Sequence, residues 1–126
     1  MSFLGRTKPA IERAQHAIRL SPFDSLNYLA YNALAISHFS TGQYEASRDA
    51  ARLSVQLNTR FSVCHLFLAA ALLRLGYQKE AKRVAQRVLA LDSAFTIRRF
   101  SVLAGFERAV FDPLADAWRE MGLPEA

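Results

Sequence analysis

The residues best suited to metal binding or nucleophilic catalysis are three histidines and a single cysteine. His16, His38 and His65 fall in separate segments and share neither the HExxH spacing nor a Cys/His spacing typical of a zinc site. Cys64 directly precedes His65, but adjacent helical positions point about 100° apart, so the two do not form a nucleophile–base pair. We therefore expect no metal site, and we interpret His38 and His65 as packing residues.

Carboxylates and glycines give no stronger sign of catalysis. Asp112, Asp116 and Glu120 are spaced by four residues, which is typical of a capped and solvated helix rather than a catalytic dyad. The five glycines stand singly and form no phosphate-binding loop. The sequence predicts that the protein is not an enzyme and uses no cofactor.

Composition indicates one compact domain. Of the 126 residues, 52% are hydrophobic and 21% are charged, which is enough apolar material for a core without indicating disorder. No apolar run reaches the roughly 18 residues that a membrane span requires, and the first residues do not resemble a signal peptide. We expect a cytoplasmic protein with no membrane partner, in which the lone Cys64 is a buried structural thiol.

One 34-residue pattern occurs twice between residues 28 and 95. Leu34 and Gly42 in the first copy correspond to Leu68 and Gly76 in the second, and the intervening small and apolar positions correspond as well. A period of this length is typical of helix hairpins that bury their apolar faces by stacking on one another. The sequence therefore predicts an all-α array of antiparallel helix hairpins.

Caps and glycines divide this array into about seven helices. Pro9 suits the first turn of a helix, and Asp112-Pro113 combines a capping residue with proline at the first helical position. The expected helices span residues 9–20, 25–40, 44–57, 61–75, 78–91, 96–105 and 112–121. We divide the chain into a partial repeat (4–24), two full repeats (28–61 and 62–95) and C-terminal helices (96–126) that cap the array by packing across the last hairpin.

The pattern of large and small residues resembles the tetratricopeptide repeat. Tyr31, Leu34 and Ala35 match the first helix of that family's unit, and Leu68 and Ala69 match it again. The resemblance implies a right-handed superhelix whose concave surface, lined by the first helices, holds a peptide or partner protein. The groove residues implied by analogy are mostly apolar and favour an apolar or helical partner segment: Leu29, Asn32, Ile36, Phe39, Leu66, Ala70, Leu73 and Arg74.

A second resemblance concerns two short runs, residues 17–24 and 111–118. They are similar to the C-terminal repeat region of bacterial class III adenylate/guanylate cyclases. In that family the repeats follow a catalytic domain and are regarded as regulatory. The resemblance implies, as an alternative function, a regulatory C-terminal module.

The formal charge of +5 allows a further alternative, an anion- or nucleic-acid-associated module. Aromatic residues do not alternate with the cations as a base-stacking platform requires, so the protein-interaction module is favoured over nucleic acid binding. The densest basic patches consist of Lys79, Lys82, Arg83, Arg87 and the pair Arg98-Arg99.

The partial first repeat predicts a homodimer. The first helix belongs to a hairpin whose other helix is missing, which leaves its apolar face without the usual partner. A two-fold pairing would cover that face, whose expected residues are Leu4, Ala14, Ala17 and Ile18.

Overall fold

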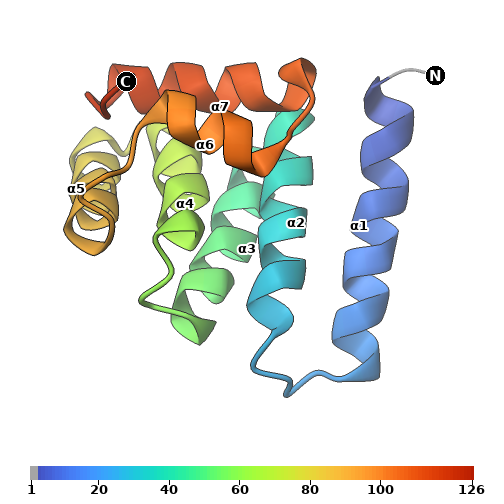
Figure 1. The fold of residues 1–126 in the computed structure, drawn as a ribbon. Coiled ribbons are helices and arrows are strands. Elements are labelled where there is room, and N and C mark those ends of the chain that lie inside the picture. The colour runs from blue at the N-terminus through green and yellow to red at the C-terminus, as the bar shows by residue number, and fades with distance from the viewer. Residues whose placement is uncertain (1–2) are drawn as a thin grey trace.

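A computed structural model describes the backbone of residues 3–126 and the side chains of residues 8–126. Within this range the secondary structure consists of α-helices joined by turns, with no strand. The helices pack against each other in adjacent pairs (Figure 1), which confirms the predicted all-α helical repeat. The seven helices are α1 (Phe3–Leu20), α2 (Asn27–Ser40), α3 (Tyr44–Leu57), α4 (Ser62–Arg74), α5 (Gln78–Leu91), α6 (Ile97–Ala104) and α7 (Arg108–Glu120).

The 34-residue period reappears in the backbone hydrogen bonds that end the first helix of each hairpin. Gln43 N–H donates to the His38 carbonyl at 2.8 Å, and the corresponding Tyr77 N–H donates to the Leu72 carbonyl at 3.0 Å. Gly42 lies between the two helices with φ 77°. Because this left-handed conformation is unstrained only for glycine, the helix ends at a fixed residue.

Small residues bring the helices of each hairpin close together. Ala35 and Ala51 in the first hairpin are fully buried, as is Ala69, the counterpart of Ala35 in the second. Ser47 Oγ donates to the Ala35 carbonyl at 2.7 Å across the α2–α3 contact. Side chains of this size allow the helix backbones to approach closely, so the core lies between the two helices of each hairpin and between neighbouring hairpins.

Two predicted helix starts are wrong. The first helix begins at Phe3 rather than Pro9, and the last begins at Arg108 rather than Asp112, so each proline lies inside its helix. In α7 the Glu107 carbonyl accepts the Phe111 N–H at 2.9 Å and starts the helix. Pro113 lacks the N–H that would bond Ala109, but both residues are exposed, so water can satisfy that carbonyl.

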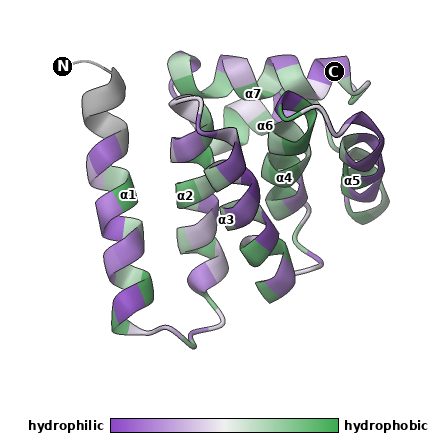
Figure 2. Ribbon diagram, turned by 180° about the vertical axis from the view of Figure 1, so that it is seen from behind, coloured by the Kyte–Doolittle hydropathy of each residue, from purple (hydrophilic) through white to green (hydrophobic). Residues whose placement is uncertain are grey.

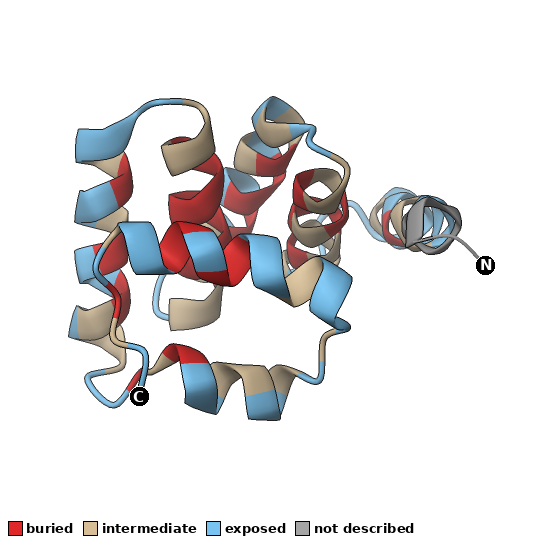
Figure 3. Ribbon diagram, turned by 90° about the horizontal axis from the view of Figure 1, so that it is seen from above, coloured by how far each residue is buried: buried red, intermediate tan, exposed pale blue. Residues whose placement is uncertain are grey.

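The position of α7 also corrects the prediction. It crosses α2 and α4, the first helices of the two hairpins, instead of the last hairpin α4–α5. Seen from above in Figure 3, α7 lies over the buried residues of the helices beneath it. The fully buried Trp118 anchors it there, because its indole Nε1–H donates to the Leu66 carbonyl at 3.0 Å. Phe95, Phe100 and Phe111 surround the indole with ring centroids 5.4–6.4 Å away.

Candidate partner-binding site

Helix α7 fills much of the groove that the sequence predicts on α4. Leu66 and Ala70 are fully buried, and Leu73 is half-buried. Arg74 Nη1 forms an ion pair with Glu120 Oε2 of α7 at 2.6 Å. The chain's own last helix therefore covers much of the predicted groove on α4, although the Leu66 side chain also lines the pocket described below.

Two of the predicted groove residues on α2 belong to the interior. Phe39 is 2% exposed, and its ring packs edge-on against Tyr44 of α3 at 5.1 Å. The buried Asn32 lies in a polar cluster in which Ser54 Oγ is 2.6 Å from Asn32 Oδ1 and 2.9 Å from Cys64 Sγ. These contacts tie α2 to α3 and α4. A charge placed at Phe39 would destabilise the hairpin instead of reporting on binding.

Only the beginning of α2 presents a predicted groove residue to solvent. Leu29 is 54% exposed, whereas Ile36 is half-buried and packs against the core. The open part of the face formed by α2 and α4 is therefore the part near Leu29, at the end of the hairpins away from α7.

The predicted dimer face on α1 is partly covered within the chain. Helix α1 packs against α2, which leaves Ala14 only 6% exposed and Ile18 half-buried against the core. Ala17 is exposed, and the side chain of Leu4 lies outside the described residues. Ala14 and Ile18 thus have an intramolecular partner in α2, so these two residues give no reason to expect dimerisation through α1.

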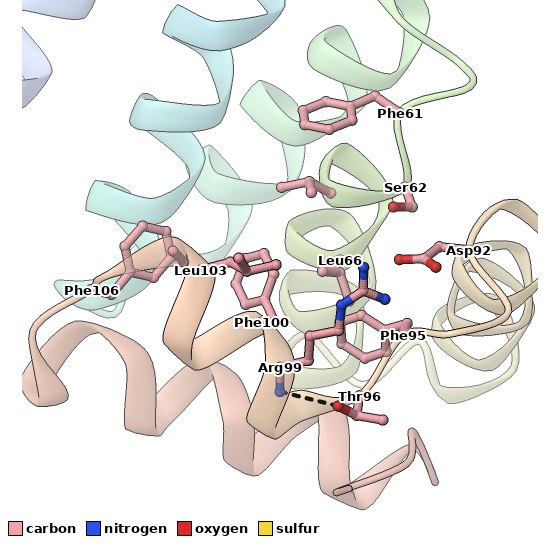
Figure 4. Close-up of a pocket in the computed structure, with 12 residues that line it drawn as sticks. Phe61, Ser62, Leu66, Asp92, Phe95, Thr96, Arg99, Phe100, Leu103 and Phe106 are labelled. Atoms are coloured by element: carbon pink, nitrogen blue, oxygen red, sulfur yellow. Dashed lines mark hydrogen bonds between the residues drawn. The ribbon is translucent and has the colours of Figure 1, made fainter.

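An apolar pocket of about 420 Å³ opens beside the covered region, between the start of α4 and α6 (Figure 4). Its interior includes the buried Leu66 and Phe95, while Phe61 and Leu103 at its edge are 36% and 73% exposed. The residues around it are Phe61, Ser62, Val63, Leu66, Asp92, Phe95, Thr96, Arg99, Phe100, Leu103, Ala104 and Phe106. Phe61 also contacts Tyr28 of α2, edge to face at 5.8 Å, which fixes one wall of the pocket.

Two opposite charges stand at this pocket. Asp92 Oδ1 accepts the Ala94 N–H at 3.2 Å, which caps the turn before α6. Arg99 is exposed, and its Nη1 donates only to the Ala94 carbonyl at 3.3 Å, so no carboxylate within the described residues pairs with it. An apolar interior edged by one cation and one carboxylate can bind a large apolar side chain whose neighbouring negative charge pairs with Arg99 and stays away from Asp92.

The C-terminal tail positions α6, which forms the second wall. The carbonyls of Pro124 and Glu125 accept the N–H groups of Ile97 and Arg98 at 2.9 Å each. Arg119 holds the tail in turn, since its Nε lies 2.7 Å from Glu125 Oε2. This hydrogen bond, with the attraction of the Arg119 charge, lowers the pKa of Glu125 below its ordinary value.

The basic patches separate in space. Helix α5 presents a hydrophilic outer face (Figure 2), whereas Arg99 lies at the pocket and Arg98 on the first turn of α6. Glu80 of α5 pairs with Arg52 of α3 at 3.2 Å. Four exposed cations of α5 have no ion-pair partner among the described residues: Lys79, Lys82, Arg83 and Arg87.

Two of the three histidines, His38 and His65, have structural partners. His65 is 6% exposed and its Nε2 lies 2.8 Å from the Thr59 carbonyl, while His38 Nδ1 lies 2.7 Å from Gln43 Oε1. Cys64 is buried, as expected. Among the described residues there is no cluster of histidine, cysteine and acidic side chains that could hold a metal ion.

None of the helices described is long and apolar enough to cross a membrane.

Sequence reasoning missed most of the pocket. Leu66 was expected in the groove and Arg99 in a basic patch, but the aromatic lining from Phe95, Phe100 and Phe106 was not assigned to a site. The available signal was the fading of the repeat after Phe95, where large apolar residues continue but the 34-residue pattern does not.

Comparison with known proteins adds no relative. No family model matches this sequence, and no curated protein matches it. The resemblances to the tetratricopeptide repeat and to the cyclase-associated region therefore remain predictions from the residues.

Proposed function

We propose that this protein is a non-catalytic protein-interaction module that receives an apolar segment of a partner protein in the pocket between α4 and α6. The observation that supports this function is the pocket itself: an apolar space open to solvent, edged by the exposed Phe61 and Leu103. Interaction hot spots are formed in this way, by a large side chain of one protein filling an apolar pocket of another.

A protein segment suits the pocket better than a small polar ligand or cofactor. Cofactor sites combine apolar walls with several polar groups that converge on the ligand. Here the polar side chains are few, and Thr96 already accepts the Arg99 N–H at 3.1 Å. No buried side-chain nitrogen or oxygen among the described residues lacks a hydrogen-bond partner, so none is held in reserve for a ligand.

The repeat architecture supports the same proposal. A tetratricopeptide-type array presents rigid helices, and rigid helices hold pocket walls in place without a further loss of entropy on binding. The proposal places the binding site at the open end of the face formed by α2 and α4 and assigns the protein no catalytic role. It also retains the cytoplasmic location expected from the sequence.

A peptide-display experiment tests the proposal. Immobilised protein is used to select from a random peptide library, and we expect enriched peptides to share one large apolar residue. Leu103→Asp places a charged carboxylate at the edge of the apolar pocket and should weaken capture of those peptides at least about tenfold, because the bound apolar residue would lose an apolar contact and meet a charge.

Val102→Asp is the matched control for this experiment. Val102 neighbours Leu103 on α6 and is 77% exposed, but it does not line the pocket. It should leave capture unchanged. Equal capture by the two variants, or a library with no enriched apolar residue, would contradict the proposed site.

A second candidate function, polyanion binding, is favoured by the unpaired cations on the outer face of α5. Contact of all four with phosphates would give a slope of about −3.6 in log affinity against log salt on duplex DNA. Reversing Lys82 and Arg83 to Glu should abolish this retention, whereas reversing the exposed Arg13 and Arg19 of α1 should not. Retention without a salt slope argues against this function. The regulatory-module alternative rests on the cyclase resemblance alone.

A further inference from the structure

The turn between α1 and α2 projects large apolar side chains into solvent. Phe23 is 99% exposed, and Leu20 and Leu26 on either side of it are 70% and 60% exposed. A phenylalanine with almost no intramolecular contact contributes nothing to the core. Apolar side chains gathered at one projecting turn are typical of a contact with another protein.

Hydrogen bonds hold this turn in one shape. Asn27 Nδ2 donates to the Ser21 carbonyl at 2.7 Å, and the Asp24 N–H donates to the same carbonyl at 3.1 Å. Asp24 Oδ1 accepts the Leu26 N–H at 2.9 Å. Phe23 is thus presented on an ordered backbone, so little conformational entropy of the main chain is lost when it is bound.

We propose that the partner for Phe23 is the apolar pocket of a second copy of this chain. The inference rests on the proposed function of that pocket as a protein-binding site. The pocket and the turn match in two respects: an aromatic side chain lies opposite an apolar space, and the Asp24 carboxylate lies opposite Arg99, although Asp92 also lines the pocket. Asp24 follows Phe23 directly and is exposed, while Arg99 at the pocket is exposed and has no carboxylate partner among the described residues.

The contact joins two different surfaces of the molecule. Phe23 cannot occupy the pocket of its own chain, because it is 99% exposed. The turn of one copy therefore meets the pocket of another, and a pair of copies closes only if both contacts form at once. This association does not use the α1 face that the sequence suggested, in which Ala14 and Ile18 pack against the core.

Light scattering across micromolar to millimolar concentrations tests the inference. We expect the wild-type mass to rise above the 14.1 kDa of one chain as concentration increases. Phe23→Ser and Leu103→Asp should each weaken this association at least about tenfold. Leu53→Ser is the control, because Leu53 is 42% exposed on α3 and belongs to neither surface, and it should associate like wild type.

Mixing the two variants separates this contact from any other mode of association. The Phe23→Ser chain keeps its pocket and the Leu103→Asp chain keeps its turn. Together they should form a one-to-one complex through a single turn–pocket contact, at concentrations at which each variant alone is monomeric. Asp24→Arg should weaken association, and mixing it with Arg99→Asp should restore it.

A wild-type mass that stays at 14.1 kDa over the whole range, or a mixture that stays monomeric, overturns the inference. Failure here is distinguishable from failure of the proposed function. If the monomeric protein still captures apolar peptides in a Leu103-dependent way, the pocket is a binding site and only the second copy is the wrong occupant. The Phe23→Ser variant should capture those peptides as well as wild type does.

Discussion

The face formed by α2 and α4 has two halves that differ in what occupies them. Toward α7 the face is sealed by Trp118, which is fully buried and bonded to the Leu66 carbonyl. Toward the start of α4 it is open, with Phe61 and Leu103 exposed around a pocket. Leu66 belongs to both halves, since its carbonyl binds the indole and its side chain lines the pocket.

The difference shows that the chain's own C-terminal helix covers much of the face that the sequence predicted as a groove. In the sealed half the chain supplies an amphipathic helix, the kind of segment that an apolar groove binds in a partner. In the open half it supplies only α6, a single wall that leaves space between itself and α4. Under the proposed function, a partner would bind only in the open half, whereas the sealed half contributes to stability.

The largest expected effect is in the sealed half, from Trp118→Ala. Removal of the indole leaves a cavity among Phe95, Phe100 and Phe111 and removes the hydrogen bond from the indole to the Leu66 carbonyl. We expect the free energy of unfolding to fall by about 3–5 kcal/mol. Urea denaturation followed by circular dichroism measures it. A loss below about 1 kcal/mol would show that α7 does not seal the face, and Val102→Ala should change stability by less than about 0.5 kcal/mol.

The same kind of truncation in the open half should separate stability from binding. Phe61→Ala removes the edge-to-face contact with Tyr28, which is worth about 1 kcal/mol. Because Phe61 lines the pocket, capture of the selected peptides should fall about tenfold. Leu57→Ala, at a similarly exposed position outside the pocket, should leave capture intact. A stability loss as large as that of Trp118→Ala would mean that the two halves do not differ.

The sequence predicted the hairpins well because their ends are marked by local chemistry. Helices α3 and α5 begin and end at the predicted residues, since a glycine turn precedes each and Asn58 or Asp92 follows it. These signals act within a few residues and depend little on tertiary contacts. The start of α7 was missed because Asp112-Pro113 suits a helix start locally, while the packing of α7 extends the helix back to Arg108.

The candidate site was harder to predict, for a physical reason. An apolar stripe on α7 shows that one face is buried but not which helix buries it, so the sealing of the groove was not foreseen. The pocket combines residues from α4, the α5–α6 connection and α6. Its existence depends on how the C-terminal helices dock, and that docking follows no sequence period.

A smaller effect is expected where α7 meets α4 at the surface. The Arg74–Glu120 pair is short, but its side chains are 27% and 54% exposed, so solvent screens the attraction. Arg74→Gln should lower stability by about 0.2–1 kcal/mol, with less effect at high salt. A double-mutant cycle with Glu120→Gln isolates the pair. A coupling above about 2 kcal/mol would show that this ion pair, rather than the buried indole, holds α7 in place.

The smallest effect concerns the tail that supports α6 and therefore the open half. The hydrogen bond from Arg119 lowers the pKa of Glu125 in the folded protein. The resulting stabilisation is present above the pKa of Glu125 in the unfolded chain and is lost as pH falls through the lower, folded pKa. An NMR titration of the Glu125 carboxyl should show this lowered midpoint, and the Ile97 and Arg98 amide shifts should follow it, because the Pro124 and Glu125 carbonyls bond those amides. Arg119→Gln should raise the midpoint toward the ordinary glutamate value, whereas Arg108→Gln, on the first turn of the same helix, should leave it unchanged. Amide shifts that do not follow the carboxyl would show that α6, and with it the pocket wall, is held independently of the tail.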